Sequence, residues 1–254
     1  MTIRDLLNEG ILFLVDCGGT EKLSDTALSA LNAELLLAYS LDESREFLFA
    51  NANGDADPGS VYMFWHYIKR LASGEPIAYI IKKKEFYGLD FFVDQRVLIP
   101  RPETEMLVEA ALKFSAANPS KKLRILDLGT GSGNIAISLA KNLPDECIDL
   151  IDAVDLSEAA CEVAKINALQ HGVDDRVSVF PADLLDFADE NGRYDLIVAN
   201  LPYIGEVSHD FVSENVEKYE PNSALFAGDD GLALYKNLFE QILGKNITCD
   251  LLIF

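Results

Sequence analysis

The sequence is poor in the residues that most often build metal sites and disulfide frameworks. Its 254 residues include three histidines, four cysteines and one tryptophan. The histidines are far apart and lack ligand spacing, which argues against a metal site. The cysteines, Cys17, Cys147, Cys161 and Cys249, form no C-x-x-C pair. We therefore expect four reduced, buried thiols, and neither disulfides nor a zinc site.

Long apolar runs and basic residues are also scarce. No apolar run reaches the length of a membrane span, so we expect no membrane-embedded segment. The N-terminus has early acidic residues and no basic leader with a cleavage site, which predicts a cytoplasmic protein. Lysine and arginine number 21 against 42 aspartates and glutamates, a formal net charge of -21. Because basic residues supply most non-specific affinity for phosphates, this balance argues against direct nucleic-acid binding.

Apolar residues make up 49% of the chain, enough for a real core, and their pattern changes along it. Residues 1–74 contain four short amphipathic segments, which predict a small helical bundle. We expect Gly18 and Gly19 to end the first helix, Ser24 and Asp25 to cap the second, and Ser60 to open the fourth. Because this region has no cluster of catalytic residues, its expected role is partner docking or support.

Two further regions follow the bundle. Residues 75–100 are rich in aromatic and β-branched residues, which predicts a β-hairpin linker. From residue 101 to Phe254, a helix to about residue 117 precedes five apolar β-runs, which alternate with helical stretches at about 134–142, 157–170 and 230–244. This alternation predicts right-handed βαβ units and a parallel, doubly wound α/β sheet. Ligands bind such sheets at the carboxyl ends of the strands, near the switch point.

A glycine-rich loop, LDLGTGSGN, follows the first predicted strand of this sheet. Gly129, Gly131 and Gly133 allow a tight turn, close approach to a ligand and contact between strand and helix. With Thr130 and Ser132 between them, they are the first candidate cofactor-binding residues. The spacing is G-x-G-x-G and not the dinucleotide pattern G-x-G-x-x-G. A glycine loop on its own is also compatible with a plain turn.

The next two strands end on carboxylates. Asp155 lies 22 residues past Gly133, where a carboxylate can bind the two ribose hydroxyls of an adenosine. It can also cap the following helix. At the end of the third strand, Asp183 can accept the adenine amino group and Leu184 can cover the ring. Three successive strand ends thus each offer one part of an adenosine site, a pattern that resembles the class I S-adenosylmethionine-dependent methyltransferases.

The fourth strand ends on Asn200, followed by Leu201, Pro202 and Tyr203. This stretch resembles the N-[PL]-P-Y motif of enzymes that methylate nitrogens in planar π-systems, either the adenine amino group or the glutamine side-chain amide. The Asn200 side-chain oxygen and the Leu201 carbonyl can each accept one N–H, and we expect Asn200 to lie beside the methyl donor as well. Pro202 biases Leu201 toward an extended conformation, and Tyr203 offers a face for stacking. A plain strand-end turn is the alternative interpretation.

Longer motifs indicate which of these two nitrogens is the methyl acceptor. GEPIAYI, EFYGLDFFVDQRVLIPRPETE, LDLGTGSG, NLPYI and YEPNSALFAGDDGLALY resemble, in this order, the glutamine N(5)-methyltransferases of peptide chain release factors, and NAELLLAYSL resembles their N-terminal helical domain. The resemblance covers nearly the whole chain. It implies a Rossmann-like methyltransferase sheet, S-adenosyl-L-methionine as cofactor, and the glutamine of a release factor's Gly-Gly-Gln motif as substrate. It also implies that the bundle helps to hold the factor, and we expect a monomer.

The sequence departs from this family in three places. Leu201 replaces the usual first proline, and Lys82 stands where glycine is usual. The family continues with a helix and two strands where this chain stops at Phe254, so we expect a C-terminally shortened sheet with an uncovered apolar edge. Two alternatives stay open. One is an adenine methyltransferase acting on ribosomal RNA or DNA, in which N-L-P-Y also occurs, and the other is an inactive scaffold.

Overall fold

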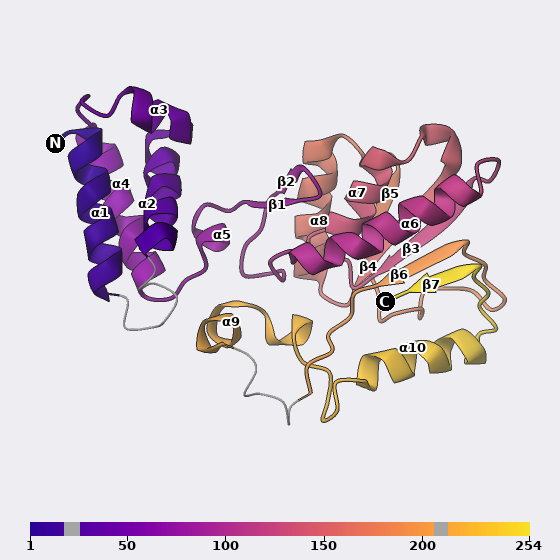
Figure 1. Ribbon diagram of the computed structural model, residues 1–254. Helices are drawn as coiled ribbons and strands as arrows, with labels where there is room; N and C mark the ends of the chain where they lie inside the picture. The colour runs from indigo at the N-terminus through magenta and orange to yellow at the C-terminus, as the bar shows by residue number, and fades with distance from the viewer. Residues whose placement is uncertain (18–25, 206–212) are drawn as a thin grey trace. The chain divides into compact units, whose positions relative to one another are not determined.

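The computed structural model of the chain describes residues 1–17, 26–205 and 213–254 (Figure 1). These residues form two compact units, Met1–Ile81 and Lys82–Phe254. None of the helices found in the described part is long and apolar enough to cross a membrane. The predicted helix stop at Gly18 and Gly19 and the predicted cap at Ser24 and Asp25 lie outside the described residues.

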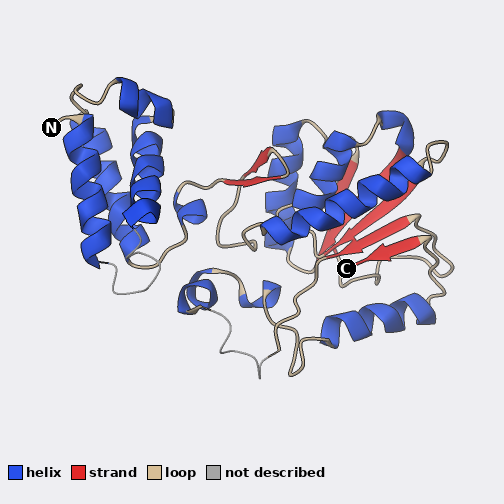
Figure 2. Ribbon diagram, in the orientation of Figure 1, coloured by secondary structure: helices blue, strands red, loops and turns tan. Residues whose placement is uncertain are grey.

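The first unit is helical, as Figure 2 shows. Its helices are α1 (Ile3–Cys17), α2 (Thr26–Leu41), α3 (Arg45–Ala50), α4 (Pro58–Ala72) and the single turn α5 (Ile77–Ile80). Leu6, Leu36 and Phe64 are fully buried in its core, because apolar residues recur at helical spacing along each helix. The helix α4 begins two residues before the predicted Ser60, since Asp57 caps it by accepting from the Ser60 N–H.

The β-hairpin occupies only part of the stretch predicted for it. Strands β1 (Lys84–Phe86) and β2 (Leu89–Phe91) pair antiparallel, while the residues after Pro76 form a helical turn. Lys82 has a φ of 54°. This left-handed conformation is unfavourable for a residue with a Cβ. It explains why glycine is usual at this position in the family that the sequence resembles.

The second unit contains a five-stranded parallel sheet with the order β5-β4-β3-β6-β7. Its strands are β3 (Leu123–Leu128), β4 (Ile148–Asp155), β5 (Val177–Pro181), β6 (Leu196–Ala199) and β7 (Leu251–Ile253). The chain runs outward from β3 through β4 to β5 and then returns to β6 on the other side of β3. The switch point therefore lies between β3 and β6. The predicted doubly wound α/β fold is confirmed.

Helices cover both faces of this sheet. Figure 1 shows α6 (Glu105–Ala117), α7 (Asn134–Asn142) and α8 (Glu158–His171) on one face and α10 (Ala233–Gly244) on the other. Because both faces are covered, most residues of the strands are apolar, and all four residues of β6 are buried. Leu238 of α10 packs in a core cluster with Leu126 and Ile197. A short helix, α9 (Glu214–Tyr219), precedes α10.

The cysteines differ from the expectation in their burial. All four are free thiols, but only Cys161 is buried, and Cys147 and Cys249 are half-buried. Cys17, the last residue of α1, is exposed. The expectation of four buried thiols is therefore wrong. Cys17 is exposed although it lies three residues after Leu14, on the face of α1 that carries the buried residues, because the helix ends there.

Candidate active site

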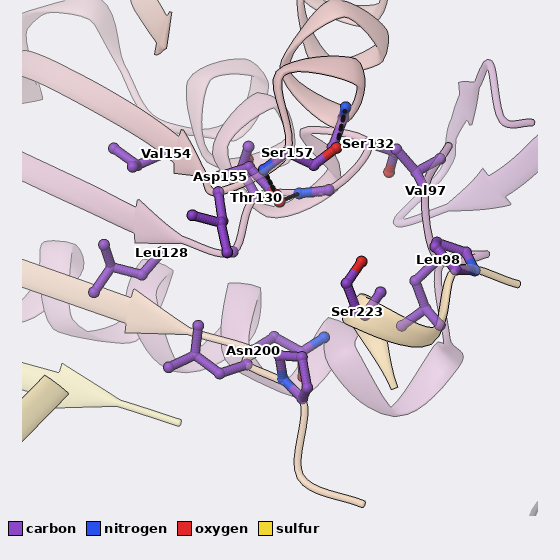
Figure 3. Close-up of a pocket in the computed structure, with 18 of the residues that line it drawn as sticks. Val97, Leu98, Leu128, Thr130, Ser132, Val154, Asp155, Ser157, Asn200 and Ser223 are labelled. Carbon is purple, nitrogen blue, oxygen red and sulfur yellow. Dashed lines mark hydrogen bonds between the residues drawn. The ribbon is translucent and has the colours of Figure 1, made fainter. Parts of the chain in front are cut away.

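A pocket opens at the carboxyl ends of β3, β4, β5 and β6. It encloses an empty volume of about 1140 Å³, which includes solvent at its mouth. Ten of the twelve candidate residues line it: Gly129, Thr130, Gly131, Ser132, Asp155, Asp183, Leu184, Asn200, Leu201 and Pro202. Figure 3 shows Asp155 and Asn200 at two of these strand ends, with Leu98 and Ser223 on the opposite side of the pocket. The sheet topology thus brings together residues up to 73 positions apart in the sequence.

Two candidate residues do not line the pocket. Gly133 has a φ of 80° where α7 begins, and a Cβ there would lie 2.8 Å from Ile137 Cδ1 and 3.2 Å from Ala164 Cβ. Its role is therefore close packing between the loop and the helices. Tyr203 is 68% exposed. Its aromatic ring lies outside the pocket wall, next to Pro202, which is part of that wall.

Asp155 connects the glycine loop to the start of α8. Its Oδ2 accepts from the Gly131 N–H at 2.9 Å, and its Oδ1 accepts from the Ser157 N–H at 2.9 Å. Burial raises the pKa of this carboxyl, and the two backbone hydrogen bonds oppose the rise. The helix cap is Ser157, whose Oγ accepts from the Ala160 N–H, so Asp155 is not the cap. Each of its oxygens retains capacity for a further hydrogen bond from a ligand.

A second carboxylate, Asp127, holds the glycine loop from behind. It is fully buried, and its Oδ2 accepts from Thr130 Oγ1 at 2.7 Å and from the Ala136 N–H at 3.2 Å. Its Oδ1 has no hydrogen-bond partner among the described residues. Burial raises its pKa to about 6. Asp127 does not line the pocket, so its contribution is to fix the loop through Thr130.

Replacing this carboxylate is expected to change how stability depends on pH. The ordinary pKa of an aspartate carboxyl is 3.8, and burial raises the pKa of Asp127 to about 6 in the folded chain. A raised folded pKa contributes stability that is fully present below the unfolded pKa and is lost as pH rises through the folded pKa. Asp127→Asn keeps an acceptor but cannot ionise. Relative to wild type, its free energy of unfolding should rise by up to about 3 kcal/mol between about pH 3.5 and pH 7. Urea titrations across this range measure the difference, and a constant difference would contradict the prediction.

Asn200 and Leu201 are each held by a hydroxyl group. Asn200 Nδ2 donates to Thr104 Oγ1 at 3.3 Å, which leaves Oδ1 to accept from a ligand. The Leu201 carbonyl accepts from Tyr235 Oη at 3.3 Å, and the Ala199 carbonyl lies 3.5 Å from the same hydroxyl. The end of β6 therefore presents two oriented acceptors, a side-chain oxygen and a main-chain carbonyl, in the wall of the pocket.

Two segments to which the sequence patterns assigned no role complete the wall. They contribute Arg96, Val97, Leu98, Pro100, Arg101 and Thr104 from one segment, and Pro221, Ser223 and Ala224 from the other. Glu220 joins them: its buried carboxylate accepts from the Ile99 N–H at 3.0 Å and pairs with Arg101 Nη2 at 2.6 Å. The RPETE and YEPNSA motifs, which are far apart in the sequence, thus meet at this ion pair.

The first of these segments is also fastened to α8. Asn167, fully buried in that helix, accepts from the Phe92 N–H at 2.7 Å and donates to the Phe92 carbonyl at 3.0 Å. Its Nδ2 also donates to the Ser132 carbonyl at 2.8 Å, in the glycine loop. The signal that could have revealed this residue is a polar amide among the apolar residues on the buried face of a helix, where it has to find partners.

The turn at residues 228–231 supports the backbone that follows the N-L-P-Y stretch. A Cβ on Gly231 would lie 2.2 Å from the Tyr203 carbonyl oxygen, and its φ is 74°. Two main-chain bonds hold the same region: the Ile204 N–H donates to the Leu225 carbonyl, and the Ala227 N–H donates to the Ile204 carbonyl. The position of Tyr203 therefore depends on a close contact that a glycine permits.

Gly231→Ala is accordingly expected to destabilise the unit by about 2 kcal/mol or more, because a left-handed φ and a steric overlap coincide. The displaced Tyr203 backbone should also lower kcat. Gly244→Ala is the matched control, since a Cβ there meets nothing within 4 Å. Thermal unfolding and turnover of both variants give the comparison. Equal Tm values for the two variants would show that the turn at residues 228–231 adapts without strain.

The parallel sheet, with its ligand pocket at the switch point and two acceptors at the end of β6, defines a methyltransferase domain. Residues 103–245 match the Methyltransferase small domain family, and residues 18–81 match the PrmC N-terminal domain. The release factor glutamine methyltransferase of Koribacter versatilis (strain Ellin345) is 41% identical over 221 residues, which cover 86% of this chain and 76% of that protein. The chain belongs to the release factor glutamine methyltransferase family.

Further comparisons agree with this assignment. The release factor glutamine methyltransferase of Bacillus subtilis (strain 168) is 40% identical over 244 residues, which cover 95% of this chain and 80% of the relative. Among solved structures, the hMettl16 catalytic domain in complex with MAT2A 3'UTR hairpin 1 has a TM-score of 0.50 and 19% identity, covering 84% of this chain and 76% of that one. This structural likeness concerns the fold alone.

Proposed function

We propose that the protein transfers a methyl group from S-adenosyl-L-methionine to the side-chain amide nitrogen of the glutamine in a release factor's Gly-Gly-Gln motif. The observation that carries the proposal is the pair of acceptors, Asn200 Oδ1 and the Leu201 carbonyl, in the wall of the same pocket as Asp155. The names of the relatives supply the substrate. We further propose a cytoplasmic monomer without direct nucleic-acid binding, consistent with the net charge of -21.

The pocket residues fit the proposed cofactor. Asp155 has hydrogen-bonding capacity for ribose hydroxyls, and Asp183 is a second acceptor in the wall. Leu156 and Leu184 provide apolar surface for a flat ring. A Cβ at Gly131 would meet nothing within 4 Å, so the loop leaves space in front of it. When bound, S-adenosyl-L-methionine supplies an electrophilic methyl group on a sulfonium.

The acceptors suit an amide nitrogen because this nitrogen is a poor nucleophile with a delocalised lone pair. Its two N–H groups can donate to Asn200 Oδ1 and to the Leu201 carbonyl, which holds the amide plane in one orientation. Asn200 is neutral, so it adds no charge that would favour the cationic ground state. Pro202 restricts Leu201, and the exposed ring of Tyr203 offers a stacking face. Catalysis then rests on orientation and preorganised polar groups.

Transfer of labelled methyl groups tests the proposal. Purified release factor should be labelled, a factor with its Gly-Gly-Gln glutamine replaced by alanine should not, and ribosomal RNA should stay unlabelled. Labelled RNA with an unlabelled factor would favour the adenine methyltransferase alternative. An absence of label on every substrate, with S-adenosyl-L-methionine bound, would favour the scaffold alternative.

We also propose that the N-terminal bundle, residues 1–74, binds the release factor and takes no part in the chemistry. The supporting observation is that, among the residues that the structure describes, those that line the pocket all belong to the second unit. A chain that starts at Lys82 should bind S-adenosyl-L-methionine with an unchanged Kd. Its KM for the intact factor should rise about tenfold or more, because the contacts between the bundle and the factor are lost. An unchanged KM would argue against docking by the bundle.

A further inference from the structure

We propose that two hydroxyl groups, Tyr235 Oη and Thr104 Oγ1, act as positioning groups for the acceptors of the substrate amide. Tyr235 orients the Leu201 carbonyl, and Thr104 orients the Asn200 side chain. Neither hydroxyl needs to touch the substrate. The inference rests on the proposed function, because it takes the donors to be the two N–H groups of a planar amide.

The peptide unit between Leu201 and Pro202 has an unusual requirement for support. Proline has no N–H, so this peptide plane can be held by hydrogen bonds only through its carbonyl. The carbonyl accepts from Tyr235 Oη at 3.3 Å. Since a carbonyl oxygen has two lone pairs, it can keep this bond and still accept from the substrate. Tyr235 therefore fixes the direction of the carbonyl without occupying it fully.

Tyr235 is itself held in place. It lies on α10, and its ring packs at 5.4 Å from the ring of Phe254. Its hydroxyl also lies 3.5 Å from the Ala199 carbonyl. A phenol hydroxyl has one hydrogen, and carbonyls only accept, so Tyr235 is the donor to this pair of main-chain oxygens. It thereby spans the last residue of β6 and the turn that follows it.

Thr104 performs the equivalent task for the other acceptor. An asparagine side chain rotates about two torsions, and the final one is broad. Thr104 is buried at the end of the turn Pro102–Thr104, and its Oγ1 accepts from Asn200 Nδ2 at 3.3 Å. With its nitrogen engaged there, the Asn200 amide is restrained, and Oδ1 is the atom available to the substrate. The RPETE segment thus contributes to the active site through Asn200.

Conservative substitutions remove each hydroxyl and little else. Tyr235→Phe keeps the ring that packs against Phe254. Thr104→Val keeps the shape of threonine, and Thr104→Ser restores the hydroxyl. Tyr194→Phe is the matched control for Tyr235→Phe, because it removes a hydroxyl that donates to Asp152 in the same sheet and does not line the pocket.

The experiment measures single-turnover methylation of the release factor, KM for the factor and Kd for S-adenosyl-L-methionine. Tyr235→Phe and Thr104→Val should each lower the rate by about tenfold, as expected for the loss of one neutral hydrogen bond that orients a reacting group. The Kd should stay within about twofold. Thr104→Ser and Tyr194→Phe should keep rates near those of wild type.

A double-variant comparison separates positioning from mere stability. With Asn200 already replaced by alanine, Thr104→Val should have no further effect on the rate, whereas Tyr235→Phe should still lower it, because it acts on the other acceptor. Wild-type rates for Tyr235→Phe and Thr104→Val, or equal losses in Tyr194→Phe and Tyr235→Phe, would overturn the inference while the proposed function stands. A wild-type protein that does not methylate the factor would overturn the proposed function and this inference with it.

Discussion

Asn200→Ala is expected to lower kcat by about 10²-fold or more, comparable to removing one preorganised polar group from an active site. The substitution removes the side-chain acceptor at the end of β6 and leaves the substrate amide free to rotate. Asn200→Asp should lose as much, for a different reason. It keeps an acceptor of the same length but adds a negative charge, which stabilises a sulfonium ground state more than the transition state.

The binding of S-adenosyl-L-methionine provides the control for both variants. Their Kd should stay within a few-fold of wild type, because the residues proposed to bind the ribose and the adenine lie at the ends of other strands. Tyr203→Phe should be much milder than either, since its proposed contribution is the face of the ring and not the hydroxyl. Single-turnover methylation decides between these outcomes. A near-normal rate for Asn200→Ala, or a Tyr203→Phe loss as deep as that of Asn200→Ala, would show that the N-L-P-Y stretch has another role.

The sheet and the strand-end residues could be predicted because they follow from local patterns. Apolar runs such as residues 123–128 and 194–199 are long enough to identify buried strands, and their alternation with helices predicts that the strands run parallel. Since parallel strands point in the same direction, their carboxyl ends must lie at one edge of the sheet. Gly129, Asp155 and Asn200 could therefore be assigned to one pocket before the structure, and the structure places all three in its wall.

The other half of the pocket wall could not be predicted in the same way. Thr104 contacts Asn200 across 96 residues of sequence, and Glu220 contacts Arg101 across 119. These contacts are made by irregular segments, where neither helical nor strand periodicity gives a direction to the side chains. The buried charge of Glu220 indicates that a partner is needed, but only the folded chain shows that the partner is Arg101. The resemblance to a known family singled out the RPETE and YEPNSA motifs, but it did not show which contacts their residues make.

Two predicted element boundaries were wrong, the start of α4 and the start of the β-hairpin. The predicted start of α4 at Ser60 was late because Asp57 has the ideal side chain for an N-cap and Pro58 fits the first turn. The hairpin was predicted too long because aromatic and β-branched residues near Ile77 suit a strand, yet they pack as one helical turn in the core of the first unit. Tertiary packing overrides local propensity in such short segments.

Asp155 is the residue whose replacement should most affect cofactor binding. In the free protein it already accepts from the Gly131 and Ser157 N–H groups, so Asp155→Ala removes the proposed ribose partner and also releases the glycine loop. We expect the Kd for S-adenosyl-L-methionine to rise by about 10- to 100-fold, equivalent to about 1.5–3 kcal/mol. Asp155→Asn should be nearly as harmful, because its amide NH₂ would face a backbone N–H, donor against donor.

Two further measurements identify the carboxylate as the cause. Asp149→Asn changes the charge by the same amount at an exposed position of the same strand, and it should leave the Kd unchanged. Burial raises the pKa of Asp155, and the ionised form is the one that accepts from two hydroxyls. The affinity of wild type should therefore fall as pH is lowered through that raised pKa, and Asp155→Asn should lose this dependence. Calorimetric titrations of the three proteins across this pH range provide the test, and an unchanged Kd in Asp155→Ala would place the ribose elsewhere in the pocket.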